Sequence, residues 1–357
     1  MGIPERVVLG SFVSSAGLTR LELEELTGLS RSVVAGVVAS LVTRGELTET
    51  RQPPSAGARG RPPARYQRTA LLPPVLLVRL TKDGSTTVSS LRGNGTRSRP
   101  RPCAPWSAAW ETWSGSVLEA ADQLRARAKL PPRLAVLSVP FPVAASHRAP
   151  VRREAAPYLV PTRSSWLQED PCPALTDLLD CPALMMNDAN LAALGEAWFG
   201  AGLGRSAVFH ICVADGIGAG FVFHGRLFTG AHGFSGELAH VQVAPEGPQC
   251  VCGNRGCLIT QPAVRRWPGR STPKEVTEYG SLVGRVLAPL VTTLDPDCVV
   301  VDARLAEKCK PFMTGVTEEL ARRCPPDLAD SLVVVAGELN DAELYGALAA
   351  ADARVAL

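Results

Sequence analysis

Hydrophobic residues in the first 50 positions recur at helical spacing in short segments that end at glycines. The segment "VVLGSFVSSAG" predicts a helix that ends at Gly17. The next segment, "TRLELEELTGL", begins at Thr19, has Glu22 three residues later and ends near Gly28. A hydroxyl residue followed three positions on by glutamate is the capping-box pattern of a helix N-terminus. Two short helices are therefore expected before residue 30.

A third helix is predicted by "SRSVVAGVVASLVTRGEL", with Ser30 as its N-cap and Gly45 as its end. Two helices joined through "TGLS", the second opening with Ser-Arg-Ser, have the layout of a helix-turn-helix. A small helical bundle with no role on DNA is the alternative. The apolar face expected of the third helix consists of Val33, Val34, Val37, Val38, Leu41 and Val42.

Residues 44–67, "RGELTETRQPPSAGARGRPPARYQ", predict a short strand, a Gly/Pro/Arg-rich tip and a return strand. Such a hairpin behind a helix-turn-helix is a wing. Arg59, Arg61 and Arg65 are separated by Gly and Pro, which suits an extended basic arm in a narrow minor groove. A solvated linker is the alternative. Residues 1–68 carry nine arginines and six glutamates, and this local positive excess favours DNA as the partner.

Beyond residue 70 the pattern changes to strands that alternate with helices, which predicts an α/β body with helices packed on a mixed sheet. "PPVLLVRL", "STTVSSL" and "RLAVLSVPFPV" are typical of strands, and "ALMMNDANLAALGEAWFGAG" of a strand that runs into a helix. "SAVFHICVADGIGAGFVFHGRLF" predicts a hairpin with its glycines at the bend. The basic loop at residues 92–101, which Pro102 follows in "RGNGTRSRPRP", is expected to be an exposed hairpin tip. No function is assigned to it.

The composition is that of a folded protein. Of 357 residues, 46% are hydrophobic and 20% charged, which allows two or three compact domains. The net charge of +3 is too small by itself to indicate a nucleic-acid partner. No apolar run approaches ~18 residues, and the N-terminus lacks the apolar core of a signal peptide. A cytoplasmic location without a membrane partner is expected, in which the ten cysteines are reduced.

The stretch "GELAHVQVAPEGPQCVCGNRGC", residues 236–257, gathers four potential ligands for a soft metal. His240, Cys250, Cys252 and Cys257 form a Cys₃His set, a complete tetrahedral ligand count that suits structural zinc. With four protein ligands no coordination position remains for water, so catalysis by the metal is not expected. Buried cysteines without a metal are the alternative.

The same stretch resembles the signature of the ROK family, in which Glu-x-x-His precedes Cys-x-Cys-Gly-x-x-Gly-Cys. "NDANLAALGEAWFGAG" is also similar to the family's segment after a core strand. This family contains sugar kinases and sugar-responsive repressors. The resemblance implies a two-lobed, actin-like and ribonuclease H-like body behind the winged helix-turn-helix. The expected domains are residues 1–70 for DNA binding, 71–190 for the first lobe, and 191–357 for the second lobe with the zinc motif and C-terminal helices.

The resemblance also implies a ligand site in the cleft between the lobes. Asn187, Asp188, Glu237 and His240 would face a sugar effector, and Asp188 corresponds to the general base of the family's kinases. A carboxylate where a strand meets a helix suits that task, because the helix N-terminus keeps it ionised. A plain helix N-cap is the alternative for Asp188.

Three loops that would hold a nucleotide depart from the family's pattern. "LLVRLTKDGSTT", residues 76–87, offers Gly84 but no Gly-Gly-Thr. "ADGIGAG" has Ala214 and Asp215 in place of an opening Gly-Thr, and the later Gly-Gly is replaced by Asp302 and Ala303. Phosphoryl transfer depends on backbone cradles for the phosphates. We therefore expect no ATP binding and no enzymatic activity, with Asp188 a vestigial base.

Residues expected to contact the sugar also depart from the family's pattern. Ile259 replaces a sugar-binding glutamate after Cys257, and Phe141 replaces the glycine of a Pro-Gly-Pro loop. The loss of a charged acceptor would cost a hydroxylated ligand about 1.5–3 kcal/mol. The pocket is therefore expected to favour a less polar or differently shaped molecule, or no ligand at all, and an effector would be a sugar or another small molecule.

The resulting hypothesis is a transcriptional regulator, a repressor, that binds operator DNA as a homodimer or tetramer. Arg31 and Ser32 at the start of the third helix would contact bases, and Arg59 and Arg61 the minor groove. One alternative is an ATP-dependent sugar kinase with an N-terminal extension, which the intact Asp188 favours. Another is a ligand-independent regulator whose pocket is closed by bulky side chains.

Overall fold

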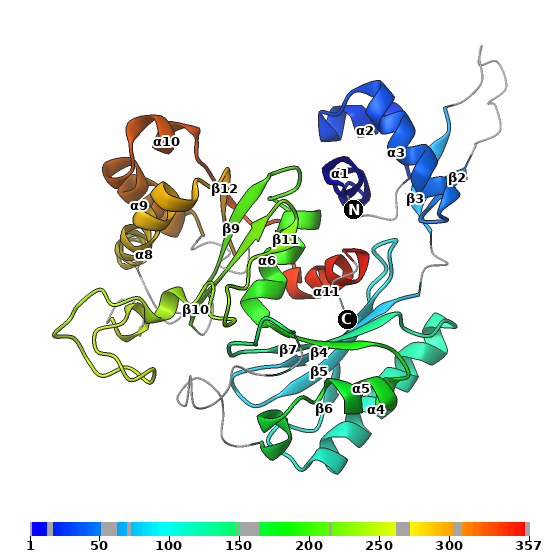
Figure 1. Ribbon diagram of the computed structural model, residues 1–357, viewed down its shortest axis with the longest axis horizontal. Coiled ribbons are helices and arrows are strands. Elements are labelled where there is room, and N and C mark those ends of the chain that lie inside the picture. The colour runs from blue at the N-terminus through cyan, green and yellow to red at the C-terminus, as the bar shows by residue number, and fades with distance from the viewer. Residues whose placement is uncertain are drawn as a thin grey trace.

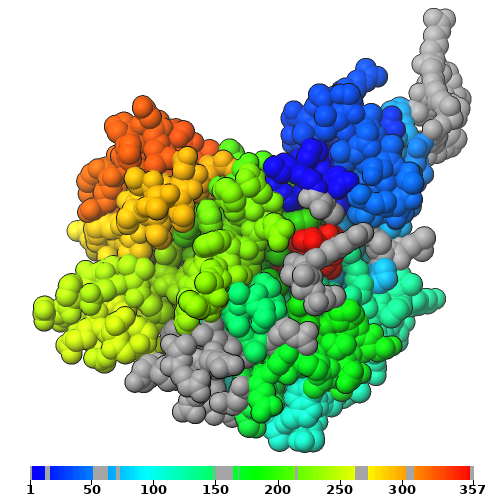
Figure 2. All heavy atoms as spheres, viewed as in Figure 1, coloured from blue at the N-terminus to red at the C-terminus, as the bar shows by residue number. Residues whose placement is uncertain are grey.

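The computed structural model describes residues 2–12, 17–50, 63–69, 73–147, 149, 164–213, 216–261, 272–302 and 309–353. They form a small N-terminal unit and two five-stranded sheets, with the unit seated above the junction of the two sheets (Figure 1; Figure 2). Among these residues no single helix is long and apolar enough to cross a membrane. One pair, α2 with α3, passes that test on length and composition when it is joined across a sharp bend.

The N-terminal unit consists of three helices and a three-stranded antiparallel sheet in the order β1-β3-β2. The predicted capping box is confirmed, because Thr19 and Glu22 bond each other's backbone N–H groups at the start of α2. Gly28 ends α2 in the left-handed conformation, with φ 66°. The elements are α1 Ile3–Gly10, β1 Leu18–Thr19, α2 Arg20–Thr27, α3 Arg31–Thr43, β2 Leu47–Thr50 and β3 Arg65–Arg68.

Three details of this unit differ from expectation. The first helix ends at Gly10 rather than Gly17, because the chain turns there to bury Phe12 in the core of the unit. Ser30 precedes α3, but its hydroxyl bonds that of Ser32 instead of capping the helix. Val33 is 38% exposed, since the buried stripe of α3 runs through Val34, Val38 and Leu41.

The first sheet has the order β6-β5-β4-β7-β8, with β4, β7 and β8 parallel and β5 and β6 antiparallel. Helices α4 and α5 cover one face, and α11 packs on β4, β5 and β7 from the other. The elements are β4 Val75–Leu80, β5 Thr86–Leu91, β6 Arg101–Cys103, α4 Trp110–Ala128, β7 Leu134–Val139, η1 Ser165–Gln168, α5 Cys172–Leu179 and β8 Ala183–Asn187.

The second sheet has the order β11-β10-β9-β12-β13, and α8 and α9 pack together on one face. The predicted hairpin is present as β9 and β10, but Gly218 and Gly220 lie within β10 rather than at its bend. A Cβ at either position would lie within 2.7 Å of an alanine Cβ in α6. The elements are β9 Ala207–Val213, β10 Ile217–Phe223, β11 Arg226–Leu227, α8 Pro273–Leu294, β12 Cys298–Val301, α9 Cys309–Arg323, α10 Pro326–Ser331 and β13 Val333–Ala336.

Helices α6, Asp188–Phe199, and α11, Ala342–Asp352, cross between the two sheets (Figure 1). Their backbones touch, because a Cβ at Gly195 would lie 2.1 Å from the carbonyl oxygen of Ala342 and one at Gly346 2.0 Å from that of Leu191. Buried side chains from both sheets converge on this helix pair in one apolar core. The crossing therefore joins the two sheets into one body.

Two buried arginines attach the N-terminal unit to this helix pair. Arg6 of α1 donates to the carbonyl oxygen of Ala197 in α6 at 3.0 Å. Arg68 of β3 is fully buried and bonds the Asp352 carboxylate in α11 at 2.6 Å. Arg133 bonds the other oxygen of Asp352 at 2.7 Å, so this carboxylate balances two guanidinium groups. The unit is therefore held by charge as well as by packing.

We expect Asp352→Asn to lower the free energy of unfolding by about 3 kcal/mol, because it leaves the buried Arg68 and the partly buried Arg133 without their counter-charge. Urea denaturation measures this. The matched control is Glu278→Gln, which breaks the exposed Lys274–Glu278 pair and should cost less than about 0.5 kcal/mol. Equal costs for the two variants would contradict a stabilising role for the buried pair.

Candidate functional site

A cleft of about 510 Å³ opens between the two sheets at the crossing of α6 and α11. Its walls come from the end of β4, the loop after β7, the start of α6, the start of η2 (Leu238–His240) and the start of α11. The polar residues that line it are Arg79, Thr81, Lys82, Asn187, Asp188, Glu237, His240, Asp302, Asn340, Asp341 and Glu343. The structure thus brings Asn187, Asp188, Glu237 and His240 together, as the sequence predicted.

Asn187, not Asp188, is the N-cap of α6. The Asn187 side-chain oxygen accepts the Asn190 N–H at 3.1 Å, and its amide nitrogen donates to the carbonyl oxygen of Phe141 at 3.3 Å. Asp188 is the first helical residue, and one of its oxygens accepts the Ala189 N–H at 2.8 Å. The Asp188 carboxylate thus lies at the cleft wall, at the positive end of the α6 dipole.

Glu237 faces Asp188 across the cleft. Burial raises the pKa of Glu237 to about 7, and the Asp188 charge adds to this rise while Lys82 opposes it. Lys82 is itself exposed at the cleft, where a Cβ on Gly216 would lie 2.6 Å from its Nζ. This part of the cleft therefore presents two acidic side chains and an ammonium group to a ligand, a combination suited to hydroxyl and acidic groups.

Phe141 and Ile259, which replace a glycine and a glutamate of the family's pattern, both line the cleft. Phe141 is 2% exposed, and Ile259 in η3 (Leu258–Thr260) packs against the core of the second sheet. The cleft keeps its volume of about 510 Å³ with both residues present. A small molecule can therefore still enter, which disfavours a pocket closed by these side chains.

The first expected nucleotide loop is the β4–β5 turn. The Asp83 carboxylate accepts the Thr81 hydroxyl and the Ser85 N–H, the latter at 3.0 Å. These bonds, the Thr81 bond first, hold the pKa of Asp83 below its ordinary value. Gly84 has φ 94° at this turn. A carboxylate thus takes the N–H group that a phosphate would need.

The structure describes only part of the other two loops that were expected to hold a nucleotide. Ala214, Asp215 and Ala303 lie outside the described residues. Asp302 lines the cleft and accepts a hydrogen bond from the Cys212 thiol at 3.0 Å. Asp302 therefore adds an acidic side chain to the cleft at the position where the resemblance implied a Gly-Gly pair.

Sequence reasoning missed a second charged cluster at the cleft. Arg79 of β4 forms ion pairs with Asp341 and, at 2.9 Å, with Glu343 at the start of α11. Ser138 of β7 donates to the same Glu343 oxygen as Arg79, at 2.8 Å. The signal in the sequence was an arginine inside the apolar strand "VLLVRL". A charge in a buried strand indicates a partner elsewhere in the chain.

The four proposed metal ligands meet beside the cleft. Their ligand atoms all lie within 4.8 Å of one another, with His240 Nδ1 3.4 Å from Cys250 Sγ and Cys252 Sγ 3.5 Å from Cys257 Sγ. Thiolates bound to one zinc ion at about 2.3 Å are about 3.8 Å apart, so the spacing fits a tetrahedral site. Burial, and then the neighbouring thiols, raise the pKa of Cys257 to about 12. A bound cation is what would ionise it.

The residues expected to contact bases lie at the exposed start of α3. Arg31 and Ser32 are both exposed in its first turn. Helices α2 and α3 are separated by three residues and bent by 117°. Arg59 and Arg61, expected in the minor groove, lie outside the described residues. Arg65 lies in β3, where it bonds the Gly17 carbonyl oxygen and Glu22.

Residues 141–354 match the ROK family, and the chain therefore belongs to this family. Its body is the α/β fold of ROK proteins. A solved structure titled as a ROK family transcriptional regulator, homologue of E. coli MLC, has a TM-score of 0.68 and 19% identity, and the match covers 98% of this chain and 96% of the other.

The curated relatives include both a kinase and a repressor. A glucokinase from Thermotoga maritima is 50% identical over 84 residues, which are 23% of this chain and 26% of the relative. The xylose repressor of Bacillus subtilis is 24% identical over 199 residues, 50% of this chain and 52% of the repressor. The chain thus spans about half, or less, of the relatives it matches. Regulators and kinases are both present among them.

We expect the purified protein to carry about one divalent metal ion per chain, which elemental analysis by mass spectrometry would count and identify. Cys252→Ser should reduce this content well below one, because it removes one of four ligands. The control is Cys103→Ser, since Cys103 lies in β6 of the first sheet. Retention of the full metal content in Cys252→Ser would contradict the ligand set.

Proposed function

We propose that this ROK protein is a DNA-binding transcriptional regulator, a repressor, with residues 1–70 as a winged helix-turn-helix and residues 71–190 and 191–357 as the lobes of an effector body. The observation that carries this is the geometry of α2 and α3, which are bent by 117° across three residues. Helix-turn-helix motifs join two helices at about 90–120° through a 3–4-residue turn. The second helix then enters the major groove by its N-terminal end.

The exposed start of α3 fits this role. Arg31 can bond a guanine edge through two N–H groups, and Ser32 can bond a base or phosphate beside it. Strands β2 and β3 support a wing from which Arg59 and Arg61 would enter the minor groove. We further propose that the protein acts as a homodimer or tetramer, because two half-sites bring affinity and specificity into the usual range.

The body would report an effector to this unit through α6 and α11. Asp188 at the start of α6 and Glu343 in the first turn of α11 line the cleft. Ala197 near the end of α6 and Asp352 at the end of α11 hold Arg6 and Arg68 of the N-terminal unit. A ligand that shifts either helix would therefore act on the seating of the unit, provided that it binds the two arrangements unequally.

Zinc is the metal that the Cys₃His donor set suits, and its role would be structural. It would fix the loop that carries Glu237 and His240 at the cleft. The effector is a sugar or another small molecule that bonds Asn187, Asp188, Glu237 and His240.

An ATP-dependent sugar kinase is the second candidate, and the place of Asp188 in the cleft favours it. The Asp83 carboxylate argues against it, since it takes the Ser85 N–H at the first phosphate loop. We expect Mg²⁺ and ATP at millimolar concentration to leave the melting temperature unchanged, because a ligand raises it only by binding the native state. A rise of several degrees in scanning fluorimetry would favour the kinase.

The regulator is tested by selecting a binding site from a random duplex pool and measuring the affinity of the selected duplex. We expect Arg31→Ala to weaken this binding about 10- to 100-fold and to relax selectivity at one base position, because a bidentate base contact contributes about 1–3 kcal/mol. The control Lys274→Ala, an exposed cation on α8, should bind like the wild type. A pool from which no sequence is enriched would rule out the proposal.

A further inference from the structure

Two segments of the first lobe carry cations and no acidic residue. Residues 92–101 contain four arginines, and residues 123–133 contain three arginines and a lysine. Two members of the second segment are paired, Arg125 with Asp122 and Arg133 with Asp352. Four others are exposed, and among the described residues none of them forms an ion pair. We call these four, Arg97, Arg99, Arg127 and Lys129, the basic edge.

The fold brings these two segments to one place. Arg92 donates to the carbonyl oxygen of Ala128 at 2.6 Å, which ties the loop after β5 to the end of α4. The loop is an ordered turn, closed by the Arg92 N–H on the Thr96 carbonyl oxygen at 2.9 Å. Lys129 ends α4 in the left-handed conformation, with φ 57°. The two acid-free segments therefore meet as neighbours at the same end of the first sheet.

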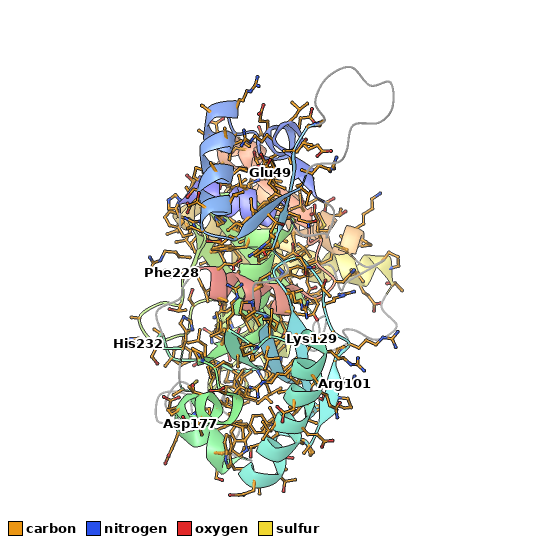
Figure 3. The ribbon with its side chains drawn as sticks, turned by 90° about the vertical axis from the view of Figure 1, so that its right-hand side faces the viewer. Glu49, Arg101, Lys129, Asp177, Phe228 and His232 are labelled. Carbon is orange, nitrogen blue, oxygen red and sulfur yellow. The ribbon has the colours of Figure 1, made fainter. Side chains whose placement is uncertain are left out.

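That end of the sheet adjoins the N-terminal unit. Val75 pairs with Leu91 on one side and with Leu134 on the other, so both segments flank the start of β4. Six residues separate Arg68, the end of β3, from Val75, a span of at most about 25 Å. Figure 3 shows Lys129 and Arg101 on the same side of the molecule, below Glu49 of β2.

Interactions through α11 also place the basic edge near the N-terminal unit. Burial raises the pKa of Tyr345 in α11, and the charge of Arg97 opposes this rise, so Arg97 lies near that ring. Tyr345 packs on Phe199 with ring centroids 5.7 Å apart, and the Arg68 guanidinium lies 5.7 Å from the Phe199 ring. Two aromatic rings therefore separate the basic edge from β3, which supports the wing.

A helix dipole accounts for part of this charge, since cations in the last turn of α4 stabilise its C-terminus. It does not account for Arg97 and Arg99, which lie in the loop after β5 rather than in α4. Like charges gathered without carboxylates repel one another, and a polyanion relieves that repulsion. Double-stranded DNA held by α3 would continue as such a polyanion past the unit.

We propose that the basic edge binds the phosphate backbone of DNA that flanks the sequence bound by α3. This rests on the proposed function, because α3 must place the duplex. The contact adds affinity but no base specificity, since phosphates are common to all sequences. The binding site of one chain on DNA is then longer than the segment that its helix-turn-helix covers.

The test uses the full-length protein and the selected duplex in two lengths, one trimmed to the selected sequence and one extended by about 10 base pairs at each end. The double variant Arg97→Gln/Lys129→Gln is compared with Lys274→Gln/Lys310→Gln. The control removes the same charge from exposed positions on α8 and α9, on the far side of the second sheet (Figure 1). Affinity is measured at several salt concentrations.

On the extended duplex we expect the basic-edge variant to lower the slope of log affinity against log salt by about two for each bound chain, since each phosphate contact contributes about 0.9. The control variant should leave the slope nearly unchanged, and the two variants should agree on the trimmed duplex. If both variants behave alike on the extended duplex, the inference is overturned while sequence-selective binding by the wild type keeps the regulator. If the wild type selects no sequence, both proposals fail.

Discussion

The close crossing of α6 and α11 is the packing constraint on which the rest of this molecule depends. Gly195 and Gly346 let the two backbones touch, and side chains from both five-stranded sheets converge on the pair. Larger residues at either glycine would force the helices apart, and the core joining the sheets would open with them. The cleft, which lies at the start of both helices, takes its shape from the same contact.

The same two helices receive the N-terminal unit, and they do so through buried charge. Asp352 serves both Arg68 and Arg133, while Arg6 donates to the backbone of α6. Buried ion pairs contribute little net stability over apolar packing, but they are costly to break and they fix one geometry. The N-terminal unit, attached in this way, has a defined orientation on the body. A small displacement of α11 at the cleft would change that orientation.

The Cys₃His cluster lies on the same loop as Glu237, so the proposed metal and the proposed effector share one element. His240 belongs to both, because its Nδ1 faces Cys250 while the residue lines the cleft. Occupation of the metal site would therefore limit the motion of the cleft wall. The proposed ion, with four protein ligands, would act through position rather than through chemistry.

The sequence by itself determined the local features: the Thr19–Glu22 capping box, the strand-to-helix corner at Asn187 and the compact Cys₃His spacing. Each of these depends on residues close together in the chain, where side-chain type and spacing nearly fix the geometry. It erred where a glycine serves a distant neighbour, as Gly218 and Gly220 do by admitting α6 against β10. The sequence did not predict the partners of four charged residues, because those partners lie far along the chain. These residues are Arg6, Arg68, Arg79 and Asp352. Only the tertiary structure decided those contacts, since the favourable place for a buried charge depends on which groups the completed fold brings beside it.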